Sequence, residues 1–174
     1  MSDTHTYLGE DRARDARPWL LLIAAAVILL DRLTKIWVVN HIEHGHWIQV
    51  IPNVFRISHV QNTGAAFSLF AERLSSSTVR DVLIGFSIVA VLVVLGMIWR
   101  TGRAFTVSAV ALALILGGAL GNLYDRIALH YVVDFLAVRI YHYNWPDFNV
   151  ADSCIVIGAC LLILELLRGP ADVD

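Results

Sequence analysis

Cysteine and lysine are scarce in this chain, and each scarcity excludes a class of function. The two cysteines, Cys154 and Cys160, lie six residues apart in one apolar segment. On a helix that spacing points them to different sides, so we expect no disulfide between them and no zinc site of the paired-cysteine type. Lys35 is the only lysine and the net charge is -2. A nucleic-acid partner is therefore not expected, because such binding rests on many phosphate contacts.

Apolar residues are abundant instead, at 57% of 174 residues. Four segments, at about 19–39, 82–99, 105–124 and 150–167, are long and apolar enough to cross a bilayer as helices. The sequence thus predicts an all-α integral membrane protein with four transmembrane helices and a small β-rich extracytoplasmic portion. We expect one membrane-embedded domain at residues 18–170, between a polar cytoplasmic tail at 1–17 and a short C-terminal tail at 171–174.

Arginines flanking the apolar segments predict the orientation, since cytoplasmic loops are enriched in basic residues. They precede the first segment, fill the tight second connection and follow the fourth, at Arg12, Arg14, Arg17, Arg100, Arg103 and Arg168. Both termini are therefore expected in the cytoplasm, and residues 40–81 and 125–149 outside it. These outer connections contain β-branched and aromatic runs typical of short strands or interface-lying segments. Asn62, Thr63 and Gly64 form a predicted turn.

Four aspartates are predicted to meet near the outer interface. Asp31 lies in the outer half of the first segment, Asp125 ends the third, and Asp152 opens the fourth. A helix rises about 1.5 Å per residue, which places these three at one level. Asp134, in the strand-like run, can fold back to meet them. Acids inside a membrane are costly, so this convergence indicates a functional site.

Each acid also has a structural interpretation. Asp31 and Lys35, four residues apart, can neutralise each other on one helix face. Asn149 can cap the fourth helix with Asp152 as the acidic member of a capping box. Asp125 at a helix C-terminus needs a cation, and a structural ion pair beside Arg126 is the favoured interpretation. Asp134, between Val133 and Phe135, has no such role and is the strongest candidate for chemistry.

Glycines and histidines outside the acids are interpreted as structural. Gly117, Gly118 and Gly121 place small residues on one helix, where they allow close approach of a neighbouring helix. The loop histidines His41, His44 and His46 resemble a metal-binding cluster only by their proximity in sequence. We therefore predict no metal and no cofactor.

Two functions other than catalysis are compatible with membrane acids. A small ion or proton transporter would use them as a relay, but transporter sites tend to lie near the membrane midplane. A non-enzymatic membrane assembly factor would use them only for structure. Asp→Glu substitutions would separate these from a catalytic pair, because a pair held to tight geometry does not tolerate the extra methylene.

Five ordered blocks carry a resemblance to lipoprotein signal peptidase, the bacterial signal peptidase II family. They are DRLTK at 31–35, NTGAAF at 62–67, GGALGNLYDR at 117–126, VVDF at 132–135 and FNVADS at 148–153. The resemblance implies a multi-pass peptidase of the bacterial inner membrane with its active site at the outer face. A peptidase of this family is expected to remove signal peptides from diacylglyceryl-modified prolipoproteins by cutting immediately before the lipidated cysteine.

The same resemblance implies residue roles. Asp134 and Asp152 correspond to a catalytic aspartate pair. Residues that shape or support the site are then Asp31, Lys35, Asn62, Gly64, Asn122, Asp125, Arg126, Asn149 and Ala151. An aspartic dyad fits the expected geometry, because two close carboxyls share one proton. Expected partners are prolipoprotein substrates and membrane lipids, with the enzyme acting as a monomer.

Overall fold

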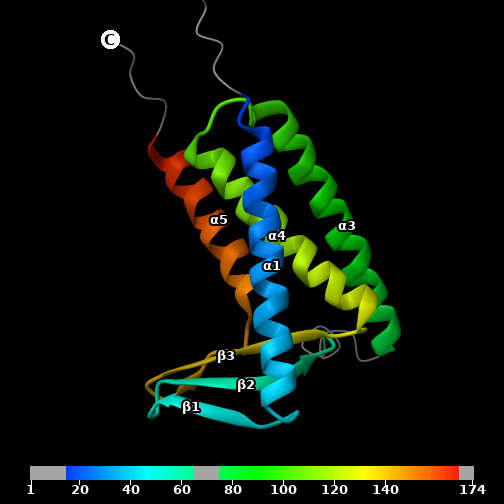
Figure 1. Cartoon of the computed structure of the whole chain (residues 1–174), viewed down its shortest axis with the longest axis vertical. Helices are drawn as coiled ribbons and strands as arrows, with labels where there is room; N and C mark the ends of the chain where they lie inside the picture. Colours follow the sequence, from blue (N-terminus) through cyan, green and yellow to red (C-terminus); the bar gives the residue numbers. More distant parts are fainter. Residues whose placement is uncertain (1–14, 65–74, 169–174) are drawn as a thin grey trace, which may run out of the picture.

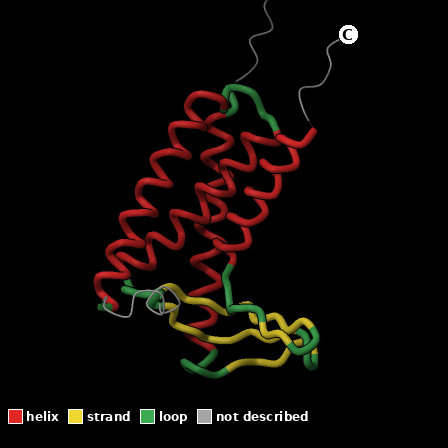
Figure 2. Tube along the Cα trace, turned by 180° about the vertical axis from the view of Figure 1, so that it is seen from behind, coloured by secondary structure: helices red, strands yellow, loops and turns green. Residues whose placement is uncertain are grey.

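A bundle of long helices stands on one small antiparallel sheet (Figure 1). The computed structural model describes residues 15–64 and 75–168. Its helices are α1 (Arg17–His41), α3 (Ser76–Thr101), α4 (Val107–Ala128) and α5 (Val150–Arg168). Its strands are β1 (Trp47–Ile51), β2 (Phe55–Asn62), β3 (Val132–Ile140) and β4 (Tyr143–Asn144), which lie in the order β1-β2-β3-β4. The view from behind shows the sheet at one end of the bundle (Figure 2).

Helix α4 is the centre of the bundle and contacts the other three helices. Within the most apolar stretch of α4, 56% of the residues are buried. In the corresponding stretches of α3 and α5 the buried share is 11%. The outer faces of α3 and α5 expose large apolar side chains, among them Phe86 and Leu166. An apolar surface of this extent faces lipid rather than water. Among the described residues, α3, α4 and α5 are long and apolar enough to cross a membrane.

Helix α1 is long enough to span but carries three charged residues, Asp31, Arg32 and Lys35, in its C-terminal half. Asp31 and Lys35 are fully buried and face the bundle. The apolar side chains of α1 that are buried, such as Leu20 and Ala24, pack in the main core with α4. The charged half of α1 therefore belongs to the interior of the fold.

Two helices extend beyond the expected apolar segments. Helix α4 continues to Ala128, so Asp125 and Arg126 lie inside its last turn and not after its end. Helix α3 begins at Ser76, where the Ser75 hydroxyl accepts a hydrogen bond from the Thr78 amide and caps the helix. Both extensions are polar turns. Hydropathy alone assigns them to the loops, because it takes no account of helix capping.

Glycines set the distance between the packed helices. A Cβ at Gly117 would lie 2.7 Å from the Ala24 carbonyl oxygen of α1, and one at Gly158 would lie 2.6 Å from that of Ala111. A Cβ at Gly118 would overlap the Ala151 carbonyl oxygen of α5. The predicted close approach of helices along this stretch is confirmed.

We expect Gly118→Ala to destabilise the protein by about 1–3 kcal/mol, because the new methyl group displaces the backbone of α5. The displaced residue, Ala151, precedes Asp152, so the position of that acid should shift as well. Thermal unfolding in detergent measures the first effect. Gly96→Ala in α3 is the matched control, because a Cβ there meets nothing within 4 Å. A Gly118→Ala protein as stable as this control would contradict close packing of α4 on α5.

Candidate active site

Asp134 and Asp152 are joined through one asparagine. The Asn149 side-chain amide donates to Asp134 Oδ1 at 2.8 Å, and the Asn149 backbone amide donates to Asp152 Oδ2 at 3.2 Å. Each carboxylate has a second amide donor of its own. Asn62 donates to Asp134 Oδ2 at 2.9 Å, and Asn122 donates to Asp152 Oδ1 at 2.7 Å. Four elements, β2, β3, α4 and α5, thus bring the two acids into one polar cluster.

The start of α5 places Asp152 by a capping box. The Asn149 side-chain oxygen accepts from the Asp152 amide at 2.9 Å, and Asp152 accepts from the Asn149 amide in return. The capping prediction is therefore confirmed. Capping and a role in the site are compatible, because the second oxygen of Asp152 is bonded to Asn122 of α4. Asp152 is half-buried, and Asp134 is only 2% exposed.

Strand β3 carries Asp134 to the site by its pairing with β2. Val60 lies opposite Asp134, and the register shifts between Ile57 and Val60, where β2 contains an irregularity. Beyond it, Asn62 reaches Asp134, while Gly64, at φ +81, donates its amide to the Asn62 side-chain oxygen at 2.9 Å. The predicted turn at 62–64 is thus confirmed. It orients the amide of Asn62, and a positive φ favours glycine.

Burial raises the pKa of Asp134 to about 7. Hydrogen bonds from Asn62 and Asn149 oppose this shift, while the nearby charge of Asp152 adds to it. Two carboxyls in one site disfavour each other's ionised form, which is the arrangement that lets a pair hold one proton at neutral pH. Asp134 is the member of the pair that the surroundings favour in its protonated form.

The raised pKa predicts a dependence of stability on pH. Between its ordinary pKa of 3.8 and about 7, the folded protein binds a proton at Asp134 that the unfolded chain releases. The stabilisation is therefore full below pH 4 and is lost as the pH rises through 7, on the order of a few kcal/mol. We expect unfolding measured from pH 4 to pH 8 to show a shallower loss of stability for Asp134→Asn. Equal slopes for the variant and the wild type would contradict the assignment.

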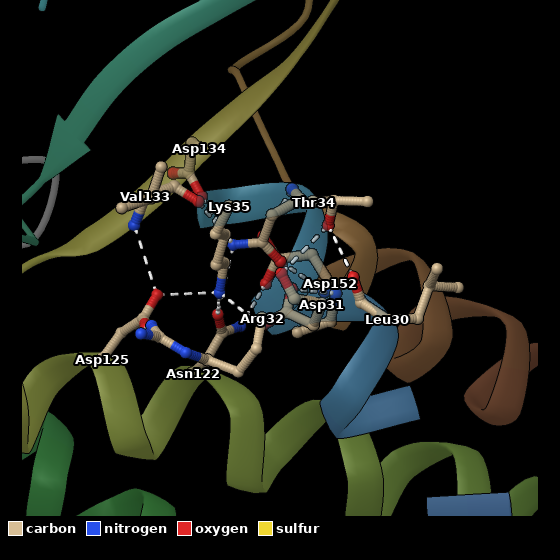
Figure 3. Close-up of polar contacts among 12 residues, drawn as sticks. Leu30, Asp31, Arg32, Thr34, Lys35, Asn122, Asp125, Val133, Asp134 and Asp152 are labelled. Carbon is tan, nitrogen blue, oxygen red and sulfur yellow. Dashed lines mark hydrogen bonds and ion pairs between the residues drawn. The ribbon is translucent and has the colours of Figure 1, made fainter. Parts of the chain in front are cut away.

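Lys35 is the centre of a buried charge cluster next to Asp134 and Asp152 (Figure 3). Its ammonium lies 2.7 Å from Asp31 and 2.8 Å from Asp125, and it donates to Asn122 Oδ1 at 3.2 Å. Lys35 is 1% exposed and both acids are fully buried. Asp31 also accepts the Ala151 amide at 3.0 Å. The cluster therefore attaches α1 to α4 and to the first turn of α5.

The predicted structural ion pair of Asp125 is confirmed, but its partners are not the adjacent Arg126. Asp125 pairs with Lys35 and, at 3.0 Å, with Arg32, both from α1. Arg126 instead donates to the Asn122 carbonyl at 3.2 Å. Asp125 points toward α1, whereas Arg126 bonds a carbonyl of its own helix, so the two adjacent side chains take different partners. The prediction that Asp31 and Lys35 neutralise each other is confirmed, although Lys35 serves both acids.

The sequence predicted no role for four residues near the site. Arg32 lies over the Tyr124 ring, 4.6 Å from its centroid, and bonds Asp125. Ser58 of β2 donates to Asp147 Oδ2 at 2.5 Å, which ties the segment before Asn149 to the sheet. Phe148 in the same segment exchanges backbone hydrogen bonds with Leu136. Arg32 could have been found from its position next to Asp31 in the sequence. Ser58 and Asp147 are 89 residues apart, so no local pattern links them.

The remaining predictions concern cysteines, metals and the outer loop. Cys154 and Cys160 are free thiols. Within residues 15–64 and 75–168, no group of three histidine, cysteine or acidic residues is arranged to hold a metal. The motif residues 65–67 lie outside the described residues.

The family is decided by comparison with known proteins. The model of the signal peptidase II family matches residues 23–168. This chain belongs to the signal peptidase II family. The lipoprotein signal peptidase of Pseudomonas putida is 44% identical over 157 residues, covering 90% of this chain and 89% of that protein. That of Solibacter usitatus is 41% identical over 148 residues, covering 84% and 88%.

A solved structure shares the fold as well. It is described as a bacterial membrane enzyme, with a TM-score of 0.81 and 30% identity, and the match covers 91% of this chain and 98% of that one. Signal peptidase II membership makes the chain a protease of lipoprotein processing, as the motif blocks implied. It also favours this function over the transporter alternative.

Proposed function

We propose that this signal peptidase II is an aspartic endopeptidase whose dyad is Asp134 and Asp152. The observation that carries the proposal is the shared contact with Asn149, which bonds both carboxylates. One acid is buried, with a pKa raised to about 7, and the other is half-buried at a helix N-terminus. Burial therefore favours the proton that the pair shares on Asp134.

In the proposed mechanism, Asp152 is the base and Asp134 the acid. The N-terminus of α5 favours negative charge on Asp152. Asp152 takes a proton from water as the water oxygen attacks the scissile carbonyl carbon, and Asp134 donates its proton to the carbonyl oxygen. When the tetrahedral intermediate collapses, the proton on Asp152 passes to the leaving amine nitrogen and Asp134 recovers its own. The pair titrates as one unit and exchanges roles during turnover.

The other residues hold this geometry. Asn62, Asn122 and Asn149 aim their amides at the carboxylate oxygens, which fixes both acids before substrate arrives. Asp31, Lys35, Asp125 and the backbone at Ala151 lock α1, α4 and α5 together beside the dyad. Arg126 is half-buried close to the acids, and we assign it to the substrate backbone. Gly64 supports Asn62.

We further propose that α1 is a fourth span, with both termini in the cytoplasm and the sheet at the outer face of the inner membrane. The dyad then lies at the outer interface, where the junction between a signal helix and a lipidated cysteine also lies. The diacylglyceryl chains would lie in lipid against the apolar surface beside α4 and α5. The peptidase is proposed to act as a monomer without a cofactor.

A substrate pair tests the proposed function. Purified protein in detergent is incubated with a diacylglyceryl-modified prolipoprotein or with the same precursor left unmodified. We expect a single cut immediately before the lipidated cysteine, located by the mass of the product. The unmodified precursor should react at least about a hundredfold more slowly, because binding energy from the lipid positions the peptide. Equal rates would contradict recognition of the lipid, and a different cut site would contradict the family's cleavage rule for this chain.

A further inference from the structure

A hollow lies on the sheet, away from the dyad. It has a volume of about 160 Å³ and lies over β1, β2, β3 and the segment at β4. Its polar lining consists of Gln49, Asn53, Arg56, Arg139 and Asn144, and Phe55 and Trp145 are its aromatic members. Arg139 is five residues beyond Asp134 on β3, or roughly 16 Å along the strand. The hollow therefore takes no part in the peptide chemistry.

The two arginines share one face of the sheet. Arg56 pairs with Ala137 across β2 and β3, and Arg139 is two residues beyond Ala137. Side chains alternate along a strand, so Arg56, Ala137 and Arg139 project from the same face. Diagonal neighbours of this kind lie about 7–8 Å apart, within reach of one ligand for long side chains. Because the residue between them is alanine, no bulky side chain fills the space.

The hollow is built for an anion. None of its lining residues is acidic, and in the described part of the chain neither Arg56 nor Arg139 has an ion-pair partner. Arg139 uses only its Nε, which donates to the Tyr141 carbonyl at 3.2 Å. Arg56 lies over the Trp47 ring, 5.0 Å from its centroid, which orients the guanidinium without neutralising it. Two guanidinium groups placed in this way can donate hydrogen bonds to the oxygens of one phosphate group.

The rim identifies the source of the phosphate. Exposed apolar and aromatic side chains surround this end of the sheet, including Val54, Ile140, Tyr143 and Trp145. Tyr141, at the turn between β3 and β4, is 91% exposed. Tyrosine and tryptophan are enriched where proteins meet the lipid headgroups. Positive charge ringed by aromatic residues is complementary to an anionic lipid surface, and less so to a free anion in water.

We infer that Arg56 and Arg139 bind the headgroup phosphate of an anionic phospholipid in the outer leaflet, while the aromatic rim inserts among the headgroups. This inference rests on the membrane orientation given under the proposed function. The bound lipid anchors the outer end of the sheet at the membrane surface, and through β3 it fixes the height of Asp134 above the bilayer.

Lipid binding can be measured without cleavage. Detergent-solubilised full-length protein is titrated with short-chain phosphatidylglycerol, below the concentration at which it forms micelles, and its thermal unfolding is followed. Short-chain phosphatidylcholine and inorganic phosphate are the comparison probes. We expect phosphatidylglycerol alone to raise the melting temperature, and Arg56→Gln or Arg139→Gln to weaken its apparent affinity about tenfold. Arg80→Gln is the matched control, because Arg80 already pairs with Asp81.

Five results decide the question. An equal shift with phosphatidylcholine, or unchanged affinity in both arginine variants, would overturn the inference. A shift with inorganic phosphate as large as with phosphatidylglycerol would assign the hollow to free anions and would also overturn it. Slower cleavage by the variants in lipid-free detergent would assign the arginines to substrate instead. Arginine-dependent lipid binding by a wild type that cleaves nothing would support this site while contradicting the proposed function.

Discussion

Asp152→Asn should lower the rate of prolipoprotein cleavage at least about a thousandfold while the protein stays folded. The carboxamide cannot take the proton of the attacking water. It also replaces one accepting oxygen by an NH₂ group, which must face either Asn122 or the Asn149 amide, both of which are donors. Single-turnover cleavage of a diacylated precursor measures the rate, and thermal unfolding in detergent measures the fold.

Two companion variants separate chemistry from charge. Asp152→Glu keeps the negative charge but moves the carboxylate by one methylene, so it should lose most of the rate as well. Asp81→Asn on α3 removes an exposed acid paired with Arg80 and should cleave like the wild type. A folded Asp152→Asn protein with near-normal turnover would remove Asp152 from the mechanism, and full activity of Asp152→Glu would indicate a role for charge alone.

The second large effect is on stability. We expect Lys35→Met to destabilise the protein by about 3–5 kcal/mol, because it leaves Asp31 and Asp125 buried without their common cation. For a chain of this length such a loss lowers the melting temperature by roughly 10 °C. Methionine fits the space of the lysine stem, so the missing charge is the main change.

Two controls accompany this measurement. Arg32→Gln removes the other partner of Asp125 but leaves Lys35 in place, and Arg32 is 27% exposed, so a loss of only about 1 kcal/mol is expected. Adding Asp31→Asn to Lys35→Met should restore part of the lost stability, because one of the two uncompensated charges is removed. A Lys35→Met protein as stable as the wild type would contradict a charged cluster at this position.

Local patterns in the sequence predicted most of the elements. Alternation in residues 47–62 and 131–143 predicted strands, which β1, β2, β3 and β4 confirm. Asn149 followed by Asp152 predicted the capping box, and the spacing of Asp31 and Lys35 predicted their pair. All of these depend on neighbours within four residues, and backbone geometry alone fixes such relations.

The contacts between elements could not be predicted from the sequence. The position of Asp31 and Asp125 along their helices predicted that both lie at one level. That both acids face Lys35 depends on how α4 is rotated about its axis relative to α1, which only the structure shows. Asp134 and Asp152 come together through Asn149, a contact between elements that no local residue pattern marks. The residues favoured Asp134 for chemistry, but Asp125 could also have reached Asp152, and the family resemblance supplied the choice.

The most direct test of the proposed dyad compares Asp134→Asn with Asp125→Asn in one cleavage assay, each corrected for its folded fraction. Both acids are buried within reach of the same polar cluster, but only Asp134 bonds the asparagine that also holds Asp152. The proposed dyad predicts a folded Asp134→Asn protein without cleavage and a less stable Asp125→Asn protein whose folded fraction still cleaves. Full activity of folded Asp134→Asn, with none from folded Asp125→Asn, would contradict it and move the second catalytic acid to Asp125.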